Sequence, residues 1–198
     1  MFGNKVLACV SFSALLLFSL GCSMLQKMAK VDMFEGDNAV KAAQAIKDKV
    51  GGEVQVIRAE IRRDKMSVTI RSPKNPKDMD TYTYENGRVS DPEPVQVIQM
   101  GNLAMTGEKY QTTNIDEIGF NALSATIARA IELSKLEDAK VNTVSMAYEH
   151  PMHTNPGERT KPLGSVALVF TWRLFVEGPR GRKDFWADKS GKLNETPF

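Results

Sequence analysis

Residues that usually carry chemistry are scarce in this 198-residue chain, which has two cysteines and two histidines. Neither Gly101 nor the turn Gly178-Pro179-Arg180-Gly181 has the spacing of a phosphate-binding loop. No serine lies in a Gly-x-Ser-x-Gly elbow, and only His150 or His153 could readily serve as the base of a serine enzyme. The sequence therefore predicts a protein that is not an enzyme and needs no cofactor, with an envelope enzyme as the weakest alternative.

A strong excess of either charge is also missing. The chain has 26 basic and 24 acidic residues, and its basic residues form no dense cluster. Nucleic-acid binding requires such a cluster, so we expect no nucleic-acid partner.

The N-terminus has one positive residue, Lys5, followed by an uncharged run from Val6 to Gly21. This is the pattern of a secretory signal. The run ends at Ser19-Leu20-Gly21-Cys22, which resembles the cleavage box of bacterial lipoproteins. That resemblance implies a signal peptide over 1–21 and lipidation of Cys22. Because the uncharged run continues to Leu25, an uncleaved membrane-spanning anchor is one alternative, and plain secretion is another.

Lipidation would hold the protein firmly at a membrane, because each buried methylene contributes about 0.8 kcal/mol. Ser23 follows the cysteine, and by resemblance to enteric lipoproteins the absence of Asp there implies sorting to the outer membrane. Cys9 would be discarded and Cys22 acylated. The mature domain would then have no disulfide, thiol nucleophile or cysteine metal ligand.

The first part of the folded region is predicted to be a helix followed by antiparallel strands. After a lipidated tether over 22–36, Asp37 is a candidate N-cap for a helix over 38–50, which stops at Gly51-Gly52. Apolar alternation and turn residues then predict strands over 54–62, 66–71 and 81–84, the last closed by a tight turn at Asn86-Gly87. We assign 37–98 to this unit.

The same order of elements follows a connector over 99–113. Asn114 and Glu117 form a candidate capping box for a long helix to about Ser134. Strands are predicted over 140–149, 166–176 and 183–187, within a second unit over 114–198. Asn38–Ala42 matches Asn121–Ala125, and Tyr82–Val89 matches Phe185–Leu193 with one insertion. The prediction is an α+β fold of two tandem repeats, each a helix packed on an antiparallel sheet of three or four strands. Whether the repeats are separate domains or share one sheet stays open.

These units resemble the PepSY and beta-lactamase-inhibitor-like group of small envelope modules. The resemblance is carried by the Ala-rich helix, Gly51-Gly52 and the segment Tyr82–Val89 in the first unit. In the second unit it is carried by Ala187–Leu193, which has the Asp, Gly and apolar ending common in that group. The resemblance implies helices on one face of an antiparallel sheet. It also implies a role in binding or inhibiting other proteins.

Two groups of residues are candidates for binding. His150 and His153 lie in a long polar insertion, which favours a recognition loop over a metal site, because zinc needs three or four well-placed ligands. The aromatic candidates are Trp172, Phe175, Tyr82 and Tyr84. Strand alternation places Trp172 on one face and Phe175 on the other. One face is expected to be core, and the second to be covered by the other repeat or by a partner.

Together these patterns predict a noncatalytic, lipid-anchored module that binds a cell-envelope protein. An inhibitor-like role is the sharper version that the family resemblance implies. A structural lipoprotein subunit of an outer-membrane assembly or transport complex is the alternative. The expected partners are the membrane, through the N-terminal lipid, and an envelope protein.

Overall fold

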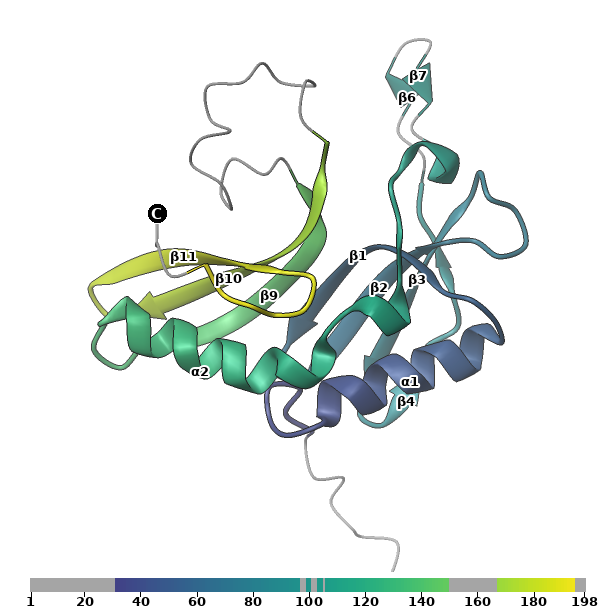
Figure 1. Ribbon diagram of the computed structural model, residues 1–198. Coiled ribbons are helices and arrows are strands. Elements are labelled where there is room, and N and C mark those ends of the chain that lie inside the picture. Colours follow the sequence, from purple (N-terminus) through teal and green to yellow (C-terminus); the bar gives the residue numbers. More distant parts are fainter. Residues whose placement is uncertain (1–30, 97–98, 101–102, 105, 150–166, 195–198) are drawn as a thin grey trace, which may run out of the picture.

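The computed structural model describes residues 31–96, 99–100, 103–104, 106–149 and 167–194. Within these residues the protein is α+β, with two helices and a large antiparallel sheet (Figure 1). The first half contains α1 (Asn38–Val50), β1 (Gln55–Arg62), β2 (Lys65–Arg71), β3 (Met79–Glu85), β4 (Arg88–Val89) and β5 (Glu93–Pro94). The second half contains α2 (Leu123–Ser134), β9 (Lys140–Glu149), β10 (Val169–Gly178) and β11 (Gly181–Asp188).

The segment that connects the two halves has short elements of its own. These are the hairpin of β6 (Gln99–Met100) and β7 (Leu103–Ala104), the 3₁₀ turn η1 (Gly107–Lys109), β8 (Thr113–Asn114), and the 3₁₀ turns η2 (Ile115–Glu117) and η3 (Phe120–Ala122). β8 pairs with β1 and therefore belongs to the main sheet. The segment between the halves thus contributes a strand to the main sheet.

The two halves share one continuous sheet in the order β11-β10-β9-β1-β2-β3-β4. They meet where β1 pairs antiparallel with β9, from Arg58 opposite Ala147 to Arg62 opposite Thr143. Both helices lie on the same face of this sheet (Figure 1). The question of separate domains or one sheet is thereby answered in favour of one sheet.

The helix predicted over 38–50 is confirmed as α1. Its buried positions, Ala39, Ala42, Ala43 and Ile46, follow helical spacing, and it ends at Gly51 in the left-handed conformation. The predicted N-cap is wrong in detail, because the Asp37 side chain accepts no capping hydrogen bond. Instead the Asp37 carboxylate pairs with Lys41 at 2.9 Å.

The long helix predicted from Asn114 is also wrong at its start. The Asn114 side chain does accept a hydrogen bond from the Asp116 N–H, but the turn that it caps is the short η2, and α2 begins only at Leu123. The chain bends at Gly119, where an added Cβ would lie 2.5 Å from the Ser190 carbonyl oxygen. A contact between distant parts of the sequence therefore interrupts the helix.

The folded region begins earlier than the predicted tether allows. Met33 and Phe34 lie in the range 22–36 but are buried, and the Met33 N–H donates to the Arg63 carbonyl at 2.7 Å. Any tether to a lipid on Cys22 therefore ends before Met33. No helix in the described part of the chain is long and apolar enough to cross a membrane.

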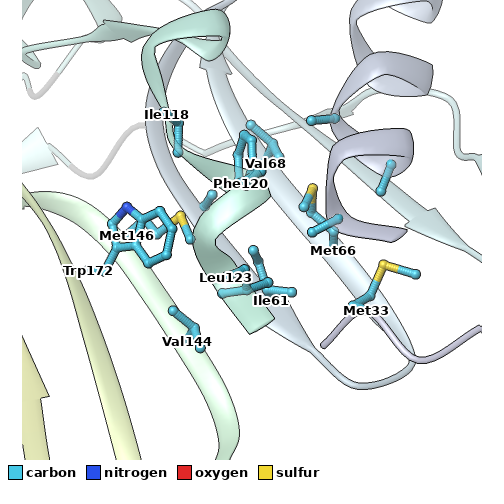
Figure 2. Close-up of a cluster of buried hydrophobic side chains, with 14 of the residues drawn as sticks. Met33, Ile61, Met66, Val68, Ile118, Phe120, Leu123, Val144, Met146 and Trp172 are labelled. Atoms are coloured by element: carbon cyan, nitrogen blue, oxygen red, sulfur yellow. The ribbon is translucent and has the colours of Figure 1, made fainter. Parts of the chain in front are cut away.

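One hydrophobic core spans both halves (Figure 2). Ile61, Met66 and Val68 come from β1 and β2, whereas Val144, Met146 and Trp172 come from β9 and β10. Phe120 in η3 and Leu123 at the start of α2 lie between these two groups (Figure 2). The segment that was expected to be regular helix thus fills the gap between the halves.

The turns that follow β3 and β11 close in the same way. Tyr84 pairs with Val89 across the first turn, and Ala187 forms a bridge with Leu193 across the second. In the match between the two units of the sequence, Tyr84 corresponds to Ala187 and Val89 to Leu193. In the second turn the Asp188 carboxylate accepts from the N–H groups of Ser190 and Lys192, and Gly191 has φ +86°. The Asp, Gly and apolar ending therefore has a local structural role.

Candidate functional site

The face of the sheet opposite the helices carries a group of arginine and aromatic side chains in the second half. On β10, Trp172 and Leu174 point into the core, so Arg173 and Phe175 point to the opposite face. Arg173 stands opposite Trp186 on β11, and Phe175 stands opposite Asp184. We call Arg173, Phe175, Arg182, Asp184 and Trp186 the arginine–aromatic cluster. Trp186 is itself buried, so the exposed part of the cluster consists of Phe175 and the two arginines.

Cation–π contacts connect the cluster. The guanidinium carbon of Arg182 lies 4.2 Å from the centroid of the Phe175 ring, and that of Arg173 lies 4.8 Å from the same centroid. Arg173 also lies 5.4 Å from the Trp186 ring. Phe175 thus contacts two cations, an arrangement that orders both arginine side chains and reduces the entropy that they would lose on binding.

Asp184 fixes the two guanidinium groups in place. Its carboxylate oxygens accept from Arg173 at 2.8 Å and from Arg182 at 2.9 Å. Burial would raise the pKa of the Asp184 carboxyl, but hydrogen bonds and charge from the two arginines outweigh burial and hold that pKa below its usual value. Two further carboxylates lie beside the cluster, because Glu177 stands opposite Arg182 and the Trp186 indole N–H donates to Glu149.

The aromatic residues predicted to bind are separated by the sheet. Phe175 belongs to the cluster, whereas Trp172 is completely buried in the core. Tyr82 is also buried, and Tyr84 is half-buried against the core. Trp172, Tyr82 and Tyr84 are thus packing residues in this structure, and Phe175 is the member of the predicted set on the opposite face.

His150 and His153 lie outside the described residues, as do Cys22 and the signal segment. Within the part of the chain that the structure describes, no group of three His, Cys, Asp or Glu side chains is arranged to hold a metal ion.

A cleft of about 530 Å³ lies between the two halves. It opens because β1 changes partner: Arg58–Arg62 pairs with β9, whereas Gln55 and Val56 pair with β8. Beyond Ala147, β9 therefore leaves β1 and continues with β10, where Tyr148 stands opposite Phe170. We call this the interhalf cleft. One wall consists of Glu53, Gln55, Thr112–Asn114 and Glu117, and the other of Tyr148, Leu168–Phe170, Asp188 and Lys189.

Two contacts bridge the walls of the interhalf cleft. The Tyr148 hydroxyl donates to the Thr112 carbonyl at 3.0 Å, and Lys189 pairs with Glu117 at 2.7 Å. The Lys189 ammonium group lowers the pKa of Glu117, and Glu117 in turn raises the pKa of Lys189. These contacts hold the cleft at a defined width without filling it.

The sequence indicated part of the cluster but not the cleft. Trp186, Arg173 and Arg182 belong to an aromatic and basic stretch that is visible in the sequence, and alternation separates Phe175 from Trp172. The cleft depends on the pairing of β8 with β1, which joins residues more than fifty positions apart. No local pattern reveals that pairing.

Comparisons with known proteins add little. No family model matches the chain, and no curated protein matches it. Among solved structures, a candidate lipoprotein from Clostridium difficile 630 is similar with a TM-score of 0.45 and 13% identity, over 87% of this chain and 97% of that one. A similarity this slight assigns neither fold nor function. The resemblance to PepSY and inhibitor-like modules therefore stays a prediction.

Proposed function

We propose that this protein is a lipid-anchored component of the bacterial cell envelope that binds a partner protein without catalysing a reaction. The arginine–aromatic cluster is the observation that carries the binding part of this proposal. Arginine and large aromatic residues are enriched where protein interfaces gain most of their binding energy. In the cluster both types are ordered in advance on a face that neither helix covers.

The anchoring part rests on the sequence before the fold. An uncharged run ending in Gly21-Cys22 supports acylation of Cys22, and Ser23 supports sorting to the outer membrane. Since the fold begins by Met33, the segment from Cys22 can extend at most about 40 Å. We therefore expect the domain to act close to the membrane surface.

The partner's chemistry follows from the charge of the cluster. The partly exposed guanidinium groups of Arg173 and Arg182 lie against the Phe175 ring, so we expect a partner surface with a carboxylate beside an apolar side chain. The shared order of a helix and three strands, with similar closing turns, supports an internal duplication. An inhibitor-like role is the more specific form of this proposal.

Purification from membranes tests both parts. Mass spectrometry of the mature protein should find an acylated Cys22, and an unmodified Met1 end would contradict the anchoring. After crosslinking in cells, the tagged chain should recover one dominant envelope protein. The double variant Phe175→Ala with Arg182→Glu should recover much less of it. The matched control Thr83→Ala, on the same face of the first half, should recover as much as the wild type.

A further inference from the structure

The interhalf cleft has the geometry of a receptor for an extended peptide. β8 and β9 both border β1, but no ladder joins them to each other among the described residues. Their facing edges diverge from Ala147 onward, and the Tyr148 hydroxyl spans the gap to Thr112. Diverging strand edges present main-chain groups to which an added extended segment can hydrogen-bond.

Apolar side chains are unusually exposed at the rim of the cleft. Leu168 is 42% exposed and Val169 is 37% exposed, and both line the cleft. Val40, on α1, is the other large apolar side chain with comparable exposure, 38%, in the described part of the chain. Beneath the rim, Tyr148 and Phe170 pack edge to face with ring centroids 5.4 Å apart. Such a rim favours a ligand with apolar side chains.

The polar lining of the cleft is predominantly acidic. Glu53, Glu117 and Asp188 contribute carboxylates, against a single ammonium group on Lys189. Lys189 is already paired with Glu117. Glu53 accepts hydrogen bonds from the neutral amides of Gln55 and Asn114, so its negative charge is not neutralised by these contacts. A cationic group on a ligand would complement this charge.

We propose that the interhalf cleft binds an extended segment of a partner protein in which Lys or Arg alternates with apolar residues. The segment's main chain bonds to the strand edges, and one set of alternate side chains packs against Leu168. The other set lies on the face that carries Val169 and Glu53, where its cationic groups reach Glu53. Alternation follows from the strand conformation, because successive side chains point in opposite directions. This inference goes beyond the proposed function and depends neither on the lipid anchor nor on the arginine–aromatic cluster.

Peptide selection on the purified full-length protein tests this proposal. The tagged chain, extracted from membranes in detergent, is immobilised and exposed to a random peptide library. We expect enriched peptides to alternate Lys or Arg with Val, Ile, Leu or an aromatic residue. The affinity of the best peptide, made synthetically, should fall about fivefold with Leu168→Ser, which removes apolar contact without adding charge, and about fivefold with Glu53→Lys. It should also weaken at higher ionic strength.

Matched controls separate the cleft from the rest of the surface. Val40→Ser changes a comparably exposed apolar side chain, and Glu93→Lys reverses an exposed carboxylate outside the cleft. Neither should alter the affinity. Thermal unfolding of each variant shows that the fold is intact, and Glu53→Gln repeats the charge test with a smaller change.

Three results would overturn the proposal: no enriched peptide, enrichment of acidic peptides, or affinity that the cleft variants leave unchanged. If Phe175→Ala removed peptide binding and the cleft variants did not, the peptide would bind at the cluster. That result would refute the cleft and leave the proposed function standing. Conversely, a chain without acyl groups that still passed the cleft tests would refute the proposed anchoring alone.

Discussion

The two halves of the sheet have the same order of backbone elements but different side chains on the face opposite the helices. In the first half this face carries rows of hydroxyl groups, with Ser67 and Thr83 at 3.1 Å and Thr69 and Thr81 at 2.9 Å. In the second half the corresponding face carries the arginine–aromatic cluster. The hydroxyl groups satisfy one another across the strands, whereas the cluster has the composition of an interface.

The order of helices and strands in a half of this molecule therefore does not determine which side chains lie on the face opposite the helices. The core faces of both halves are apolar and contribute to one hydrophobic cluster. The side chains on the faces opposite the helices do not have to pack into that shared core, so they can differ between the halves. We therefore expect substitutions on the core face to change stability in either half, and substitutions on the opposite face to change binding mainly in the second half.

The largest expected effect contrasts the two faces of β10. Trp172→Ala should destabilise the protein by about 4 kcal/mol, because it leaves a cavity between the halves. Phe175→Ala should cost only about 1 kcal/mol, since the ring is half-buried on the other face. Urea unfolding of both variants measures the difference. Equal losses would mean that the two faces of this strand are buried alike.

A second contrast compares the turns that close the two halves. Gly87 and Gly191 have φ +78° and +86°, but a Cβ at Gly87 would meet open space. At Gly191 it would lie 2.8 Å from the Ala122 Cβ and 3.0 Å from the Trp172 ring. Gly191→Ala should therefore cost about 3 kcal/mol and Gly87→Ala about 1 kcal/mol. Thermal unfolding would refute this contrast if the two variants lost the same stability.

The smallest expected effect concerns pH and the cluster. Because the pKa of Asp184 is lowered in the folded state, its carboxylate stabilises the fold above its usual pKa. This contribution is lost as pH falls through the folded-state pKa. Asp184→Asn should cost about 1 kcal/mol at neutral pH, and the cost should shrink as the pH falls below the usual pKa of an aspartate. A cost that did not change with pH would show that the ion pairs contribute nothing to stability.

Local sequence patterns predicted most of the elements. Helical spacing and a terminal glycine defined α1, and alternation located β1, β2, β9, β10 and β11 to within a few residues. These elements were predictable because burial on one side imposes a period on the sequence itself. The same alternation separated Trp172 from Phe175, although it could not tell which face the helices cover.

The features that sequence reasoning missed depend on contacts between distant residues. The start of α2 is displaced because Gly119 meets Ser190, and Met33 joins the core because its N–H reaches Arg63. The interhalf cleft exists because β8 takes over the pairing of β1 from β9. None of these contacts leaves a periodic signal within a single segment, so only the tertiary structure reveals them.

Site-specific photo-crosslinking in intact cells tests the central claim most directly. A photoreactive amino acid replaces Phe175 in the cluster or Thr83 on the hydroxyl-rich face of the first half, and mass spectrometry identifies what each position captures. We predict that position 175 captures one envelope protein through a segment rich in carboxylates, and that position 83 captures far less of it. Equal capture at both positions, or capture at position 83 alone, would contradict a binding surface confined to the second half.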